Sequence, residues 1–387
     1  AAELGLPRAQ LFLGHCYDDG MGVDQSPPQA VEWFRQAAQT GYPDAVMQLG
    51  LCYLYGHGTA TDEKQAAELF QQAASEGNIR AMNELGLCYE AGRGVEKDIH
   101  RAAELYRQAA QSGMAAAQCN LGVLTLHGVG TEADPAAAAE WFRRAAEQSF
   151  ARAQDLLGDC YLDGKGVEAD PARAAELYRR AGEQGYAPAQ CNLAVCYLNG
   201  IGVEEDMAQA VAWFQKAVEG GSARAKSILG DFYLDGRGVE QDKEKALSLY
   251  RESAADGYLP AICSLGLCYE TGDGVAEDKA QAVEWYTRAA EGGYAPAQTN
   301  LAVCYFNGIG VDKDVECAHQ WLEKAAEQKF PRALNILGDC HWDGTGVEQD
   351  RGEAARLYRQ AAEQDYPPAL CNLGLCYEHG DGVEQDK

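Results

Sequence analysis

The strongest constraint on the fold is a motif that returns every 36 residues along the chain. In each copy a leucine precedes a small residue, and no insertion separates the copies. A fixed period of this length indicates one helical unit stacked end to end, because such a unit buries its apolar side only against its neighbours. The sequence therefore predicts a single continuous all-α solenoid over residues 1–387, not several globular domains. The small residue stands at Gly14, Gly50, Gly86, Gly122, Gly158, Ala194, Gly230, Gly266, Ala302, Gly338 and Gly374.

Each copy predicts two helices joined by a glycine loop. In the copy around Gly158, Ala153, Leu157 and Tyr161 recur at helical spacing and form the apolar side of a first helix. Two glycines separated by one residue follow, which is typical of a turn that needs positive φ. Asp170, directly before a proline, is then expected to cap the second helix.

The loop itself, "LDGKGVEAD" at residues 162–170, resembles an ion or phosphate site. A phosphate cradle, however, needs its glycines to run from a strand directly into a helix, and here a helix comes first. A calcium loop needs oxygen ligands at alternate positions, and "LHGVGTEAD" at 126–134 has no carboxylate before its glycines. We therefore interpret the loop as a helix connector, with no metal or cofactor.

The sequence also repeats over a longer period, equal to three of the 36-residue copies. "LAVCYLNGIGV" from Leu193 returns as "LAVCYFNGIGV" from Leu301, 108 residues later. The same interval relates Leu229 to Leu337 and Leu265 to Leu373. Duplication of a three-repeat block explains this period by ancestry alone, and a recurring binding surface is the functional alternative.

The charge of the chain limits its partners. The net charge is −27, so the phosphate backbone of a nucleic acid would be repelled. No apolar run is long enough to span a membrane. A protein or peptide with basic and apolar residues is the partner that such a surface would attract.

Taken together, the alanines, the paired loop glycines, the aspartate cap and the 36-residue period resemble the Sel-one-like repeat (SLR) family, which is related to tetratricopeptide repeats. The resemblance implies a right-handed α/α superhelix whose first helices line the concave face. It also implies a scaffold or adaptor in signalling, protein quality control or bacterial host interaction, and not an enzyme. Consistent with this, the seven histidines fall at unrelated positions of the repeat and pair with no nucleophile motif.

The 14 cysteines bear on the cellular compartment. All but Cys317 fall on predicted first helices. Pairs such as Cys191 and Cys196 are five residues apart on one helix, about 8 Å by helical rise, too far for a disulfide. Buried reduced thiols and a cytoplasmic location are therefore expected. Some members of the family are secreted and disulfide-rich, so a secreted or envelope-associated host-interaction protein stays open.

The sequence varies on the side of the first helix opposite its apolar stripe. An apolar floor with acidic patches there would suit a basic and apolar segment, and asparagine amides could bond its backbone. Alternatively, the aliphatic residues pack neighbouring repeats, the aspartates are solvated, and the asparagines bond adjacent helices. The candidate binding residues are Asn120, Asp155, Asp159, Asn192, Leu198, Asp231, Asp235, Asn300, Phe306, Asp339, Trp342, Asp343 and Asn372.

The sequence thus predicts a non-catalytic adaptor that binds a protein or peptide in its concave groove. Its opening "AAELGLPRAQ" matches the tail of another repeat, so we expect both ends to be cut inside a repeat. The alternative is the regulatory solenoid of a larger enzyme or signalling protein.

Overall fold

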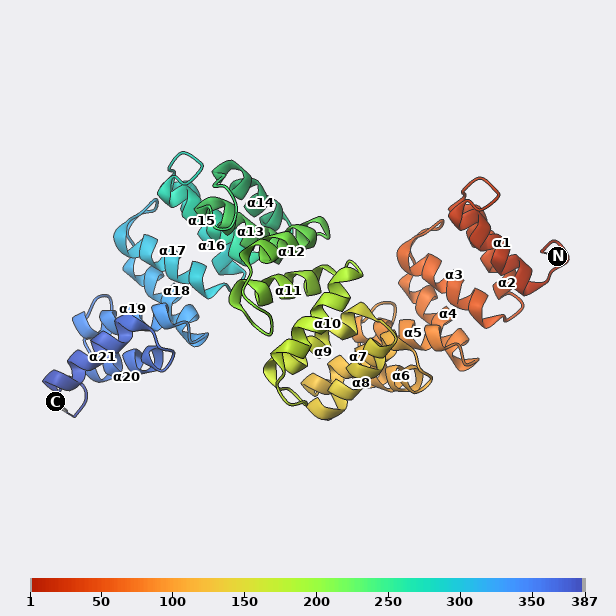
Figure 1. Cartoon of the computed structure of the whole chain (residues 1–387), viewed down its shortest axis with the longest axis horizontal. Helices are drawn as coiled ribbons and strands as arrows, with labels where there is room; N and C mark the ends of the chain where they lie inside the picture. The colour runs from red at the N-terminus through yellow and green to blue at the C-terminus, as the bar shows by residue number, and fades with distance from the viewer. Residues whose placement is uncertain (1, 385–387) are drawn as a thin grey trace. The chain divides into compact units, whose positions relative to one another are not determined.

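The computed structural model describes residues 2–384 and is entirely helical over that range (Figure 1). It divides into two units, Ala1–Asp206 and Met207–Lys387. The all-α prediction is confirmed. Continuity of the solenoid across the two units stays a prediction.

First and second helices alternate along each unit. The first helices are α1 (Pro7–Asp19), α3 (Pro43–Tyr55), α5 (Ile79–Ala91), α7 (Ala115–His127), α9 (Ala151–Asp163), α11 (Ala187–Asn199), α13 (Ala223–Asp235), α15 (Leu259–Thr271), α17 (Ala295–Asn307), α19 (Pro331–Asp343) and α21 (Pro367–His379). The second helices are α2 (Pro27–Ala38), α4 (Glu63–Ser75), α6 (Ile99–Gln111), α8 (Pro135–Glu147), α10 (Pro171–Glu183), α12 (Met207–Glu219), α14 (Lys243–Ala255), α16 (Lys279–Glu291), α18 (Val315–Glu327) and α20 (Arg351–Ala362).

Local chemistry sets both ends of the loop between the helices. The first loop glycine takes a left-handed conformation that no L-residue adopts freely, as at Gly164 with φ of 69°. The second helix then begins at an aspartate whose carboxylate accepts a backbone N–H three residues on, as Asp170 does from Arg173 at 3.0 Å. Both predictions for the loop are confirmed. The same cap forms at Asp62, Asp98, Asp134, Asp242, Asp278, Asp314 and Asp350.

The second loop glycine is needed for close packing between repeats. Gly130 has a φ of 67°, and a Cβ placed on it would come within 2.6 Å of the Ile99 carbonyl oxygen at the start of α6. The loop of one repeat therefore sits against the N-terminus of the preceding second helix, a contact that leaves no room for a side chain.

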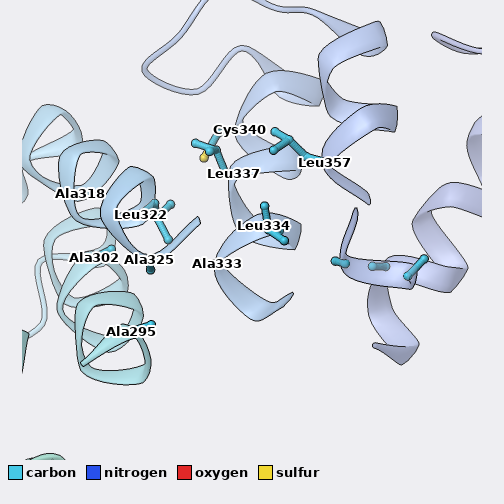
Figure 2. Packing of buried hydrophobic residues seen from close by; sticks show 13 residues of the cluster. Ala295, Ala302, Ala318, Leu322, Ala325, Ala333, Leu334, Leu337, Cys340 and Leu357 are labelled. Atoms are coloured by element: carbon cyan, nitrogen blue, oxygen red, sulfur yellow. The ribbon is translucent and has the colours of Figure 1, made fainter. Parts of the chain in front are cut away.

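The core is built from small residues that let helices approach closely. A Cβ on Gly158 of α9 would come within 2.6 Å of the Tyr178 ring of α10, so this glycine accommodates the ring. Within each unit, second helices pack on their own first helix and on the next one, as α10 does on α9 and α11. Figure 2 shows this arrangement in the second unit, where Ala302 of α17, Leu322 of α18 and Leu337 of α19 converge.

Candidate functional site

The candidate residues lie on one side of the first helices, which we call the first-helix face. It comprises the positions two and three before, and one, four and five after, the small residue of each repeat. Successive first helices also contact one another: α9 contacts α11, and α17 contacts α19. These contacts reduce the part of the first-helix face that solvent can reach. Burial divides the candidates accordingly: Asn120 and Asp155 are 9% and 6% exposed, whereas Asp235 and Asp343 are open to solvent. Asn120 and Asp155 are thus buried within the stack, and their role in binding a partner stays a prediction.

Carboxylates one position after the small residue are bonded to the second helix. The Tyr178 hydroxyl of α10 donates to Oδ1 of Asp159 at 2.7 Å. The same bond joins Tyr358 to Asp339 at 2.8 Å. These aspartates are half-buried acceptors within the repeat, so the alternative that they are merely solvated is wrong.

Two other repeats make this bond with a glutamate one turn further along the first helix. Tyr106 donates to Oε2 of Glu90, and Tyr286 donates to Oε2 of Glu270, each at 2.6 Å. The longer side chain compensates for the shift of three residues, because positions one and four after the small residue lie on the same helix face.

Copies without these carboxylates carry an apolar residue in place of the tyrosine. Phe142 accompanies Val123 and Leu126, and Leu322 accompanies Val303 and Phe306. The first repeat departs from the pattern, since Phe34 accompanies Asp18; there the carboxylate pairs with His57 at 2.6 Å instead. Much of the variation on the first-helix face thus follows from whether a buried hydroxyl needs an acceptor.

Burial shifts the proton affinity of two of these carboxyls. Desolvation raises the pKa of Asp231 above its ordinary value, although the hydrogen bond from Tyr250 and the charge of Arg237 act in the opposite direction. Desolvation also raises the pKa of Asp339, against the hydrogen bond from Tyr358.

The four candidate asparagines bond the preceding first helix in every case. Asn120 of α7 donates from Nδ2 to Asn83 of α5 at 3.1 Å, and it accepts from Arg152 of α9 at 3.0 Å. One amide therefore connects three consecutive first helices. The equivalent donations run from Asn192 to Asp155 at 3.0 Å, from Asn300 to Cys263 at 3.7 Å and from Asn372 to Asn335 at 3.1 Å.

These amides are engaged within the protein, as the structural alternative anticipated. Arg332 repeats the role of Arg152 by donating to Asn300 at 2.6 Å, and Asn372 also bonds Asp339 at 3.1 Å. Their proposed role in holding the backbone of a partner stays a prediction.

The apolar candidates are half-buried. Phe306 packs edge-on against His319, with ring centroids 5.4 Å apart. The guanidinium of Arg351 lies 5.0 Å from the ring centroid of Trp342. Leu198 is half-buried near the end of α11. Each of these three side chains keeps part of its surface open to solvent.

Sequence reasoning missed the tyrosine hydroxyls and the arginines that complete these bonds. A signal was present, because tyrosine at this second-helix position coincides with a carboxylate one or four residues after the small residue. For the arginines the partner lies 32 residues away along the sequence, and only the stacking of repeats brings the two together.

Between residues 2 and 384, no helix has the length and apolar composition that a membrane crossing requires. Over the same range, no group of three or more His, Cys, Asp or Glu side chains is arranged to hold a metal ion.

Comparison with known proteins identifies the repeat. The family model described as Sel1 repeat matches residues 7–42, 43–78, 79–114, 115–150, 151–186, 187–222, 223–258, 259–294, 295–330, 331–366 and 367–387. Each matched segment except the last, which holds α21 alone, contains one first helix and one second helix. A search of curated proteins returned no match.

Two solved SLR-type structures are similar to this chain. One is c5321, a protective antigen present in uropathogenic Escherichia coli strains and displaying an SLR fold. It is 37% identical with a TM-score of 0.65, over 100% of this chain and 82% of that one. The other is a Sel1 repeat protein from Oxalobacter formigenes, 30% identical with a TM-score of 0.58, over 63% of this chain and 96% of that one.

A more distant match is the human IFIT1 dimer with m7Gppp-AAAA, which shares the fold alone. It is 14% identical with a TM-score of 0.51, over 92% of this chain and 86% of that one. The Sel1 matches tile nearly the whole sequence, and this fold is typical of protein-interaction scaffolds that are generally not catalytic. The chain belongs to the Sel1 repeat family.

Proposed function

We propose that the chain is an adaptor whose first-helix face binds a protein segment carrying basic and apolar residues. The observation that carries this proposal is the division of carboxylates on that face. Those one position after the small residue are used internally, whereas those five positions after it, Asp235 and Asp343, are exposed. The half-buried Trp342 directly precedes the exposed Asp343, and this pair suits a partner with Lys or Arg next to an apolar anchor.

Contact between successive first helices supports the concave placement of this face. Such contact occurs between α17 and α19 and between α19 and α21. Helices on the inner side of a curved stack lie closer together than those on the outer side, so this is the side on which a groove would form.

A selection from random peptides displayed on phage tests the proposal. Wild-type protein should enrich peptides in which Lys or Arg adjoins an apolar residue. The triple variant Asp163→Asn, Asp235→Asn, Asp343→Asn should lose that enrichment, because it removes exposed charge without touching a tyrosine bond. A control with the same charge change on second helices, Glu68→Gln, Glu244→Gln, Glu323→Gln, should keep it. Equal enrichment by the triple aspartate variant would overturn the proposal.

We also propose that the protein works in a reducing compartment, as in the cytoplasm. Support comes from the cysteines, which form no disulfide in the described part of the chain, lie on first helices except for Cys317 and are mostly buried. Maleimide labelling of the cysteines in denaturant tests this assignment.

A further inference from the structure

A pocket of about 650 Å³ opens in the first unit between α5, α6 and α7. Leu87 of α5, Ile99 of α6, and Val123 and Leu124 of α7 line it, together with Val129 of the loop that follows α7. A pocket of this size, with apolar walls, is typical of sites that enclose one bulky side chain or a small ligand.

The rim of this pocket is cationic in a chain with a net charge of −27. The lining includes the half-buried Arg93 and the exposed Lys97 of the loop after α5, together with the exposed His127 of α7. Glu90 is the one carboxylate in the lining, and its Oε2 accepts the hydroxyl of Tyr106. That bond directs the negative group towards the interior of the repeat.

Arg93 differs from the other basic residues at its loop position, between the two loop glycines. Lys165 pairs with Asp163 at 2.7 Å, His57 pairs with Asp18 at 2.6 Å, and Arg237 lies over the Phe232 ring at 4.7 Å. Nε of Arg93 is buried and has no hydrogen-bond partner among the described residues. The Arg93 side chain as a whole is only half-buried, so its guanidinium can meet an incoming carboxylate from the solvent side.

Two contacts hold one wall of the pocket, the loop after α7, in place. The loop that carries Val129 is held by Gly130, which packs on the Ile99 carbonyl, and by a 3.2 Å contact from Nδ1 of His100 to the Gly130 oxygen. Val129 is nevertheless 45% exposed, so an apolar surface is presented in a rigid position. Preorganised walls reduce the entropy lost on binding.

We propose that this pocket docks a protein segment in which a bulky apolar side chain stands next to Asp or Glu. The side chain fills the space between Leu87, Val123 and Val129, and the carboxylate meets Arg93 and Lys97. This inference rests on the proposed adaptor function. It adds a second requirement for the partner: an acidic residue beside an apolar side chain at this pocket, whereas the exposed carboxylates elsewhere on the first-helix face attract basic residues. An acidic segment is repelled along most of the chain, so the cationic rim also provides specificity.

Methyl NMR of the whole chain, titrated with short capped peptides, tests the proposal. A peptide with the core Asp-Trp-Asp should shift the methyl signals of Leu87, Ile99, Val123 and Val129 at millimolar concentration. Peptides with the core Lys-Trp-Lys or Asp-Ala-Asp should not, because each lacks one of the two features. Arg93→Gln or Lys97→Gln should weaken the binding about two- to fivefold each, as expected for a partly exposed ion pair.

Matched variants separate this site from a general surface effect. Val129→Ser should abolish the shifts without unfolding the chain, since the side chain is exposed. Lys165→Gln and Ile201→Ser, the equivalent loop positions of the next two repeats, should leave binding unchanged. Absence of the shifts with Asp-Trp-Asp, or equal shifts with Lys-Trp-Lys, would overturn the proposal. Neither result would affect the phage selection, which depends on Asp163, Asp235 and Asp343.

Discussion

The hydroxyl of Tyr250 on α14 donates a 2.6 Å hydrogen bond to Oδ1 of Asp231 on α13. This bond joins the two helices of one repeat through a tyrosine that is almost fully buried and a carboxylate that is partly buried. It explains why aspartate and aliphatic residues alternate at one position of the first-helix face. The residues that remain available to a partner are those one turn further along, at Asp235 and its equivalents.

Removing the donor should destabilise this repeat. Tyr250→Phe leaves Asp231 without its hydroxyl partner and should cost about 1–3 kcal/mol. Adding Asp231→Val should recover most of that loss, because it recreates the Val and Phe combination of Val123 and Phe142. Denaturation combined with hydrogen exchange in α13 and α14 measures both, since a repeat array need not unfold in two states. If the double variant loses as much free energy of unfolding as the two single variants together, the hydrogen bond is not the cause of the loss.

The same pair should govern a dependence of stability on pH. Burial raises the pKa of Asp231 above that of the unfolded chain. The protonated carboxyl therefore stabilises the fold at low pH, and this contribution is lost as the pH rises through the raised pKa. Because the Tyr250 hydrogen bond lowers this pKa, Tyr250→Phe should raise the pKa further and extend the window upward. Carboxyl ¹³C NMR of Asp231 in both proteins measures the shift, and an unchanged or lower pKa in the variant would contradict the assignment.

Replacing a positive-φ glycine by alanine should destabilise the protein by an amount that depends on the atoms around that glycine. Gly113 has a φ of 91°, and a Cβ placed on it would meet nothing within 4 Å, so Gly113→Ala should cost about 1–2 kcal/mol from backbone strain alone. Gly130→Ala adds a clash with the Ile99 carbonyl and should cost clearly more. Thermal unfolding of the two variants provides the comparison. Equal losses would show that the loop does not press on α6.

The sequence predicted what is local and repeated, and it failed where partners are distant along the chain. Helix pairs, loop glycines and aspartate caps depend on neighbours within a few residues. The bond from Asn120 to Asn83 spans 37 residues and exists only once repeats stack. Stacking also buries Asp155, because its helix α9 contacts α10, the preceding second helix α8 and the next first helix α11. Burial on several sides is not visible in the periodicity of one helix.

The ends of the second helices are another place where the sequence alone did not predict the backbone conformation. Glycine follows most second helices in the sequence and takes positive φ there, as at Gly185 with 85°. Ser149, Lys329 and Asp365 adopt the same conformation, with φ of 62°, 60° and 54°. The position requires a left-handed turn in every repeat, and packing imposes it on these three residues despite their side chains.

The asparagine bonds should make consecutive repeats cooperative. Asn120→Ala removes the partner of both Asn83 and Arg152, and it should cost about 1–3 kcal/mol because Asn83 is buried. Hydrogen exchange should speed up in α5, α7 and α9 together. Ser264→Ala, at the equivalent position of α15, has no such network and serves as the control. Faster exchange confined to α7 would mean that the amide does not couple its neighbours.

Thiol reactivity should follow burial closely. Burial raises the pKa of Cys52 to about 12 and that of Cys88 to about 11, so at neutral pH neither is present as the reactive thiolate. Cys371 is exposed and should react first with a maleimide in the native protein. Peptide mass spectrometry identifies the labelled positions, and rapid native labelling of Cys52 or Cys88 would contradict the packing. In denaturant, protein purified without added reductant should label at all 14 cysteines. A much smaller number would indicate disulfides and would place the protein in an oxidising compartment, contrary to our proposal.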